Sequence, residues 1–282
     1  MSIDSTWLRC PNCFSALDAV SERVFGCVNG HRFDRAKHGY LTLLPPKAPR
    51  TVGDDRAMLA ARAELLDGGT YAPIAEAIVE SLIGDGSATE PPGRLRVADL
   101  GCGTGYYSRR VRGAIPDADI LLADRSPDAV RMALRDVPGA TGVVLDIWRP
   151  LPVRDAVVDV ILDVFAPRNA AEFARVLRPG GRAIVVVPTR AHVRELREAG
   201  AMIDIPAEKA ASAADQLRPA GLELTSGRNI EYRIEMDAGL RRLIAGMGPS
   251  AHHAASLAPL GDDARTPVTV SVDVLVFTRT SD

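Results

Sequence analysis

The sequence predicts an α/β protein in which a mostly parallel sheet has helices on both faces and follows a small cysteine-containing module. Three observations predict this fold. Apolar strand-like runs alternate with helix-like segments between residues 93 and 188, which is typical of parallel sheets. Glycines and aspartates follow the ends of these runs, where such sheets bind ligands. Three of the four cysteines lie within residues 10–27.

Composition limits the class of protein. The 282 residues, 46% hydrophobic and 25% charged, suit one large globular domain or two smaller ones. With no signal peptide and no uncharged apolar run of about 18 residues, we expect a cytoplasmic protein without a membrane span. The net charge of −2 argues against a strongly basic nucleic-acid coat. Residues 1–62, however, hold nine Lys/Arg against six Asp/Glu, and this net charge of +3 is compatible with an anionic partner.

The cysteine-containing module, predicted to span residues 1–46, has the ligand spacing of a metal site. Two residues separate Cys10 from Cys13, thirteen residues then follow, and three residues separate Cys27 from His31. Three Cys and one His form a closed tetrahedral set, which is the pattern of structural zinc. A redox Cys-x-x-Cys pair, the alternative, would not require the second pair. The sequence therefore predicts one structural Zn²⁺.

Directly after this cluster, cationic and aromatic side chains alternate. Arg32, Arg35 and Lys37 are followed by Tyr40. Cations interleaved with aromatic rings suit phosphate contact and base stacking in a nucleic acid. A solvated rim around a small zinc module would have the same composition, so both interpretations stay open.

The next segment, residues 47–92, is predicted to be a helical linker. Its residues 56–83 read as two helices that are broken at Gly68 and Gly69. Residues 93–282 follow as the main α/β domain. At their end, residues 221–237 and 267–280 alternate polar and apolar positions and predict two long antiparallel strands that close the sheet.

A glycine-rich turn opens the main domain. In "RLRVADLGCGTGYYSRRV" an apolar strand ends near Asp99, glycines stand at 101, 103 and 105, and a helix begins near Tyr106. Such a turn lets a ligand approach the backbone closely. A dinucleotide fingerprint would need its third glycine at position 106, and a P-loop would need a following Gly-Lys-Ser/Thr. Both phosphate-binding motifs are therefore disfavoured.

Several polar residues share one position in the predicted sheet, at or just past a strand end. The carboxyl ends of parallel strands meet at one edge, so we expect these residues to line one pocket. The set is Asp99, Gly101, Gly103, Asp124, Asp146 and Asp163.

These motifs resemble the S-adenosylmethionine-dependent methyltransferases. The resemblance rests on "DLGCGTG", "LLADRS", "LDIW" and "LRPGGRAIVVVP". It implies a Rossmann-like class I methyltransferase sheet, in which the glycine turn faces the methionine and ribose part of the cofactor. It further implies that Asp124 holds the ribose hydroxyls, as a carboxylate can, and that Asp146 and Ile147 flank the adenine. Another nucleotide binder on the same sheet is the alternative.

Most of the chain is similar, more narrowly, to the guanine-N1 methyltransferase A family of ribosomal RNA enzymes, in particular its actinomycete tylosin-resistance branch. The motifs are "LRCPNC", "ARAELLDGGTYAPI" and "DVFAPRN". The resemblance implies methylation of a 23S rRNA guanosine, of the 748 type rather than the 745 type, with macrolide resistance as a consequence in some relatives. It also implies a zinc module that recognises RNA, and a homodimer. The cofactor contacts that it implies are Tyr71, Asp99, Gly101, Gly103, Thr104, Gly105, Asp124, Asp146, Ile147 and His192, and the zinc ligands are again Cys10, Cys13, Cys27 and His31.

N1 of guanine carries a proton, which must leave during methylation. The enzyme has mainly to position two reactants, and a base that accepts this proton would add a smaller factor. Asp163 is the candidate base, with a structural hydrogen-bond acceptor as the favoured alternative, and Phe165 is a candidate wall of the base pocket. A small-molecule methyltransferase of the same fold is the alternative function. A nucleic-acid-binding module with a vestigial cofactor site is disfavoured by the intact glycine turn.

Overall fold

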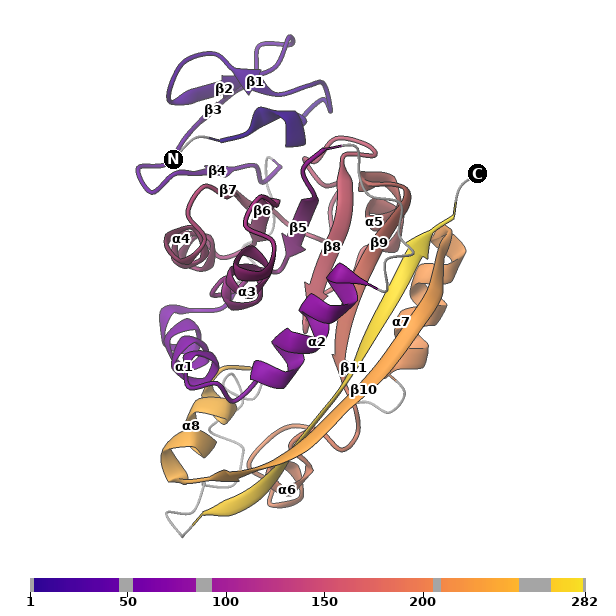
Figure 1. The fold of residues 1–282 in the computed structure, drawn as a ribbon. Coiled ribbons are helices and arrows are strands. Elements are labelled where there is room, and N and C mark those ends of the chain that lie inside the picture. Colours follow the sequence, from indigo (N-terminus) through magenta and orange to yellow (C-terminus); the bar gives the residue numbers. More distant parts are fainter. Residues whose placement is uncertain (1–2, 46–52, 85–92, 205–208, 249–264, 281–282) are drawn as a thin grey trace.

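A computed structural model describes residues 3–45, 53–84, 93–204, 209–248 and 265–280, and its centre is one twisted sheet (Figure 1). β11 runs antiparallel to both of its neighbours, and every other neighbouring pair is parallel. The eight strands, in order across the sheet, are β10 (Leu222–Met236), β11 (Thr266–Arg279), β9 (Leu177–Pro188), β8 (Val158–Val164), β5 (Arg96–Leu100), β6 (Asp119–Asp124), β7 (Thr141–Val144) and β4 (Tyr40–Thr42).

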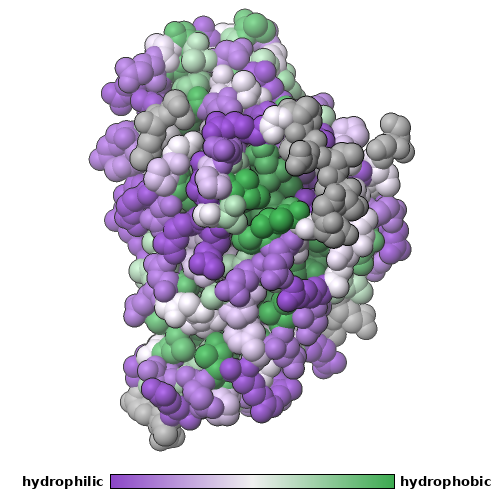
Figure 2. Space-filling model, viewed as in Figure 1, coloured by the Kyte–Doolittle hydropathy of each residue, from purple (hydrophilic) through white to green (hydrophobic). Residues whose placement is uncertain are grey.

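Helices cover both faces of this sheet, which confirms the predicted fold class. One face packs against helices α1 (Arg56–Asp67), α2 (Ala72–Ile83), α3 (Tyr106–Ala114), α4 (Pro127–Asp136), α6 (Arg194–Glu198) and α8 (Ala238–Gly246). The other packs against α5 (Ala170–Val176), α7 (Lys209–Leu217) and the N-terminal module, and the short helix η2 (Arg218–Ala220) follows α7. The face drawn in Figure 2 is mostly hydrophilic, because most apolar side chains lie inside these two layers.

Local sequence signals set the helix boundaries near the site. The Asp55 side chain caps α1 by accepting from the Met58 N–H at 2.9 Å. The chain then breaks at Gly68 and Gly69, as predicted, and α2 begins with a proline in its first turn. The two predicted long strands are confirmed as β10 and β11, which pair antiparallel. Within the described chain, none of the helices is long and apolar enough to span a bilayer.

The N-terminal module covers part of the sheet and shares its core. It consists of the short helix η1 (Ser5–Trp7) and the strands β1 (Asp18–Ala19), β2 (Val24–Gly26) and β3 (Arg32–Asp34). Its buried Trp7, Leu8 and Phe25 belong to one apolar cluster with Leu151 and Phe173 of the main domain. The connection between β7 and β8, residues 145–157, contains no helix. The module therefore fills the place that a crossover helix would otherwise take on this face.

β4 joins the module to the sheet in a way that the sequence did not indicate. It lies within the predicted module yet pairs in parallel with β7, with Leu41 opposite Val143. The predicted boundaries at 46/47 and 92/93 fall in or beside segments outside the described residues, so the three-part division stays a prediction.

Candidate functional site

The predicted metal ligands lie together in the module. The ligand atoms of Cys10, Cys13, Cys27 and His31 are all within 4.8 Å of one another. The Sγ atoms of Cys13 and Cys27 are 3.6 Å apart, and the Nδ1 atom of His31 lies 3.5 Å from the Sγ of Cys10 and 3.3 Å from that of Cys27. Tetrahedral zinc bonds would give edges of about 3.8 Å between sulfurs and about 3.6 Å from sulfur to nitrogen. The four residues therefore fit one zinc ion.

Two tight turns bring these ligands together. The Phe14 N–H donates to the Cys10 carbonyl at 2.9 Å, and the Gly30 N–H donates to the Cys27 carbonyl at 3.1 Å. Hydrogen bonding to the Asn29 side chain and to the backbone of Ser15 lowers the pKa of the Cys13 thiol to about 5. A thiolate is the form that binds zinc, so this ligand is ready for the metal at neutral pH.

The glycine turn links β5 to α3 at the carboxyl edge of the sheet. The N–H groups of Gly101 and Cys102 donate to the Ala123 carbonyl at 2.8 and 3.0 Å, which fastens the turn to the neighbouring β6. Gly105 has a left-handed φ of +83°, and a Cβ at this position would lie 2.7 Å from the Cα of Ala133 in α4. Thr104 is buried beside it. Glycine is therefore required at position 105 for α4 to pack against the turn.

Two carboxylates lie beside this turn. The Asp124 oxygens accept from the Gly103 N–H at 3.0 Å and the Ser126 N–H at 2.8 Å. Each oxygen has a further lone pair, so this carboxylate can still accept from two ligand hydroxyls. Asp99 accepts from the Ser108 hydroxyl at 2.6 Å, and burial raises its pKa to about 7. Burial also raises the pKa of Asp124, and its two N–H donors oppose that rise.

Asp146 lies past the end of β7 and is tied to the same loop as Asp124. Its carboxylate accepts from the Trp148 N–H at 3.1 Å and pairs with Arg125 at 2.5 Å. The adjacent Ile147 carbonyl accepts from the Asn169 side chain at 2.9 Å. Arg125, which the sequence analysis did not single out, thus holds together the loops that carry Asp124 and Asp146.

Three aromatic side chains from separate loops lie together, two of them predicted cofactor contacts. Ring centroids are 5.9 Å apart for Tyr71 and His192, and 6.1 Å apart for Phe165 with each of them. Phe165 has a left-handed φ of +55° and is 41% exposed, whereas Tyr71 and His192 are buried. A large side chain held in this backbone conformation is strained, and such strain gathers at functional sites.

The hydrogen bonds of this cluster determine which of its atoms carry protons. The Ser271 N–H can only donate, so the His192 Nδ1 at 3.3 Å accepts. Burial, with Arg197 and Lys209 nearby, lowers the pKa of His192 to about 4, so the ring is neutral and carries its proton on Nε2. That N–H donates to the Tyr71 hydroxyl at 3.1 Å. The Tyr71 O–H is therefore left to donate to a ligand.

Asp163, the predicted base, faces the opposite side of the sheet from Asp99. It is fully buried, and its nearest cationic atom is an Arg168 guanidinium nitrogen at 3.7 Å. Its neighbours Leu162 and Val164 pack on the α3 side, whereas Ile161 packs on the module side, and side chains alternate along a strand. Asp163 thus faces the module side, opposite Asp99 and its partner Ser108. Burial raises the pKa of Asp163 well above its ordinary value, and its role as a base stays a prediction.

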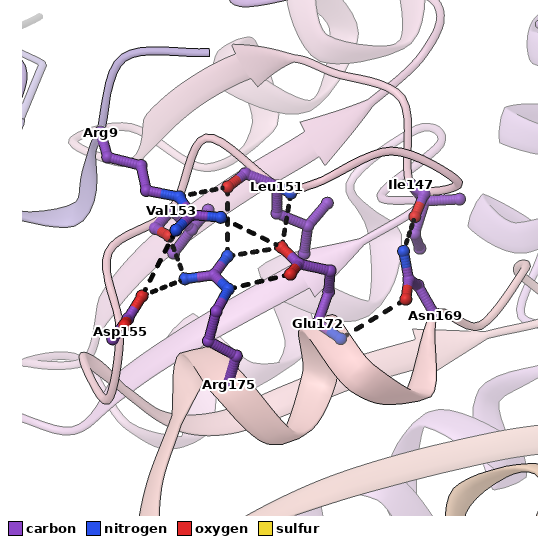
Figure 3. Close-up of polar contacts among 8 residues, drawn as sticks. All are labelled: Arg9, Ile147, Leu151, Val153, Asp155, Asn169, Glu172 and Arg175. Carbon is purple, nitrogen blue, oxygen red and sulfur yellow. Dashed lines mark hydrogen bonds and ion pairs between the residues drawn. The ribbon is translucent and has the colours of Figure 1, made fainter. Parts of the chain in front are cut away.

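Polar side chains fasten the module to the loop after Asp146 (Figure 3). Arg9 donates to the Leu151 carbonyl at 2.9 Å, and the Leu151 N–H donates to Glu172 at 2.6 Å. Glu172 also pairs with Arg175 at 2.5 Å and with Arg9 at 3.5 Å. The sequence analysis missed this network. Asn169, which caps α5, and Glu172 three residues later have the spacing of a capping box, and this signal places Glu172 in the first turn of α5.

The predicted RNA-contact residues do not form one group. Arg32 donates to the carbonyls of Cys27 and His31 at 3.2 and 3.1 Å, so it supports the metal loop. Arg35 and Lys37 line a groove between the module and α4. Tyr40 lies half-buried in β4, and Phe165 lies with Tyr71.

The fold and the site are those of an S-adenosylmethionine-dependent methyltransferase of class I that carries a zinc ribbon. The features that define this class are the parallel sheet with one antiparallel strand, the glycine turn with its strand-end carboxylates, and the Cys₃His cluster. Family models agree with both parts. Residues 8–51 match the zinc ribbon described as "RlmA, N-terminal", and residues 97–181 match "Methyltransferase domain". The residues beside the glycine turn suit this cofactor, because the described residues leave lone pairs of Asp124 and the hydroxyl proton of Tyr71 available to a ligand.

Curated relatives identify the family. The chain is 39% identical, over 88% of its length and 86% of the relative, to the 23S rRNA (guanine(748)-N(1))-methyltransferase of Streptomyces fradiae. It is 39% identical, over 87% of both chains, to a Micromonospora griseorubida protein assigned as a 23S rRNA (guanine-N(1)-)-methyltransferase. The chain belongs to the family of the 23S rRNA (guanine-N1) methyltransferases.

A solved structure supports the fold. The chain resembles a Haloferax volcanii methyltransferase, solved with the Trm112 methyltransferase activator, with a TM-score of 0.51 and 20% identity. The match covers 79% of this chain and 95% of the other.

Proposed function

We propose that this protein methylates N1 of a guanosine in 23S rRNA, at a position of the 748 type, with S-adenosylmethionine as the methyl donor. One observation supports this most directly. The similarity to the Streptomyces fradiae enzyme runs through both the zinc ribbon and the methyltransferase sheet, at 39% identity over 88% of the chain. A small-molecule methyltransferase would not need the ribbon.

The groups around the glycine turn would hold the cofactor, which supplies a methyl group on a cationic sulfonium. In this proposal Asp124 accepts from the ribose hydroxyls, the turn of Gly101, Gly103, Thr104 and Gly105 faces the rest of the molecule, and Asp146 and Ile147 border the adenine. Asp99, with its pKa of about 7, is partly ionised at neutral pH, and its ionised form favours a cationic ligand. Tyr71, oriented by His192, donates its hydroxyl proton to the ligand.

The residues of the chain would act mainly by positioning the acceptor base. Phe165 offers an exposed ring next to Tyr71, and an aromatic face is a platform for a base. We propose that Arg35 and Lys37 contact the RNA backbone, while Arg32 and Tyr40 keep the ribbon and the sheet edge in place. Holding two reactants in register can supply most of the rate enhancement for a methyl donor that is already reactive.

Labelled methyl transfer tests this function. The purified protein, unmodified 23S rRNA transcripts and radiolabelled S-adenosylmethionine should give methylated RNA, and a transcript with adenosine at the target should stay unlabelled. Methylation at N1 blocks the Watson–Crick edge, so primer extension should stop one nucleotide before the target. Label on small acceptors instead of RNA would favour the alternative function.

Three further parts of the proposal have their own measurements. The family resemblance implies a homodimer, which sedimentation equilibrium measures directly. Cytoplasmic location is checked by cell fractionation. A consequence for macrolide susceptibility is checked by comparing growth of cells with and without the gene in the drug.

A further inference from the structure

A guanidinium group lies over the glycine turn of the cofactor site. Arg62 comes from the middle of α1, and its Nη1 atom would lie 3.2 Å from a Cβ at Gly103. The side chains nearest to a Cβ at the other two glycines of the turn are those of Ala166 and Ala133. Of these three neighbouring side chains, only that of Arg62 carries a charge.

Neighbouring elements hold this side chain in place. The guanidinium of Arg62 pairs with Asp54, and its Nη2 donates to the Met247 carbonyl at 2.5 Å. In Figure 1, α1 lies between α3, which follows the glycine turn, and α8, which ends beside Met247. Within the described chain, these two contacts use two of the five N–H groups of the guanidinium, so three are left for a ligand. The Arg62 side chain is 25% exposed, so a ligand can reach it.

Carboxyl groups surround the same turn. Asp124 accepts from the Gly103 N–H at 3.0 Å. Burial raises the pKa of Asp124, the negative charge of Asp54 adds to this rise, and the positive charge of Arg62 opposes it. Burial also raises the pKa of Asp99, and the charge of Asp124 adds to that rise. These acids interact with one another, so a ligand carboxylate that entered the site without a cationic partner would be repelled.

The proposed cofactor carries such a carboxylate. The methionine part of S-adenosylmethionine ends in one carboxylate and one ammonium group, close to the cationic sulfonium. With Asp124 assigned to the ribose hydroxyls, this end of the molecule extends along the glycine turn. The surrounding acids suit the ammonium and the sulfonium, whereas the carboxylate requires donors that also carry positive charge.

We propose that Arg62 binds the α-carboxylate of the methionine part of S-adenosylmethionine, and thereby selects the intact cofactor over ligands that lack this group. The inference rests on the proposed function and adds a residue of α1 to the proposed cofactor site. A guanidinium matches a carboxylate with two parallel, charge-assisted hydrogen bonds. A contact of this strength should change the affinity by about 10- to 100-fold.

Two ligands isolate this contact in calorimetric titrations of the full chain. They are S-adenosylmethionine and its decarboxylated analogue, which keeps the adenosine, the sulfonium and the amine. The unchanged protein should bind the intact cofactor about 10- to 100-fold more tightly than the analogue. The variant R62Q should bind the two ligands about equally, because the substitution and the decarboxylation remove the same contact. R62Q should also raise the KM for the cofactor and leave the KM for RNA unchanged.

A purely structural role for Arg62 would give a different result. Its contacts with Asp54 and Met247 join the start of α1 to the end of α8, and their loss would then disturb the turn for every ligand. In that case R62Q would weaken the binding of both ligands by the same factor, and the preference of the unchanged protein would persist.

Arg109 provides a matched control. It lies on α3, is 41% exposed and pairs with Asp67 at 2.5 Å, so it is also a partly exposed arginine with an aspartate partner. Its side chain lines a groove between α2 and α3. The variant R109Q removes the same charge from the protein and should keep the full preference for the intact cofactor.

The outcomes are distinguishable. Equal affinity of the unchanged protein for the two ligands would overturn the role of Arg62 without any variant, and so would a preference that survives in R62Q. An equal loss of preference in R109Q would also overturn it, because the effect would then follow the net charge and not a contact. If the unchanged protein methylates rRNA in any of these cases, the proposed function stands. If it binds neither ligand, the proposed function itself fails.

Discussion

Alanine at Gly105 should separate two physical costs at the cofactor turn. Gly105 has a φ of +83°, and a Cβ there would lie 2.7 Å from the Cα and 2.8 Å from the Cβ of Ala133. Gly139, in the turn between α4 and β7, has nearly the same φ of +84°, but nothing lies within 4 Å of a Cβ there. The two positions share the backbone cost and differ in the packing cost.

The magnitudes follow from this comparison. An alanine in the left-handed conformation costs about 1–2 kcal/mol, which both variants should show. Forcing atoms into packed space adds about 1–3 kcal/mol, and only Gly105→Ala should show this. Contact with Ala133 involves backbone, so α4 has to move to relieve it. The movement should also disturb the Gly103 N–H that donates to Asp124.

Urea unfolding of both variants measures the two costs, and calorimetry measures their affinity for S-adenosylmethionine. We expect Gly105→Ala to lose about 1–3 kcal/mol more in the free energy of unfolding than Gly139→Ala, and to bind the cofactor more weakly. Equal destabilisation of the two variants, with equal cofactor affinity, would refute the argument that α4 requires glycine at this turn.

Four other perturbations have expected outcomes. Glu172→Ala removes the acceptor of the Leu151 N–H and one partner of Arg9 and Arg175, which both keep Asp155, so the free energy of unfolding should fall by about 1–3 kcal/mol in urea titrations; an unchanged free energy contradicts the network. His192 has a folded pKa of about 4, below its unfolded value of about 6.5, so protonation of the unfolded chain removes stability as pH falls between these values. The stability advantage over His192→Gln should therefore shrink by about 3 kcal/mol from pH 7 to pH 4, and a constant difference would speak against the neutral ring. Asp163→Asn should keep turnover within a few fold, because this carboxyl is fully buried and faces away from the cofactor turn; a loss of 100-fold or more would make Asp163 the base. Chelation of zinc should lower the melting temperature of the whole protein, because the module shares the core of the sheet, and an unchanged circular-dichroism melt of the sheet would contradict this.

The sequence alone determined those features that depend on local spacing. Residues close together in the sequence predict the alternation of strands and helices, the helix break at Gly68 and Gly69, and the glycine turn after Asp99. They can do so because local backbone preferences set turns and helix ends. The spacing of the Cys and His ligands likewise predicted their convergence on one metal. These features are all confirmed by the structure.

Tertiary structure decided which side chains face one another. β8 is buried on both faces, so its sequence has no polar alternation that could tell which way Asp163 points. Several contacts form only when separate elements pack together. They are the contacts of His192 with Tyr71, of Arg125 with Asp146, and of Arg9 with Glu172. The groove between the module and α4 likewise depends on the pairing of β4 with β7 at the edge of the sheet. Local patterns fix the elements, but the burial of apolar faces against one another fixes their neighbours.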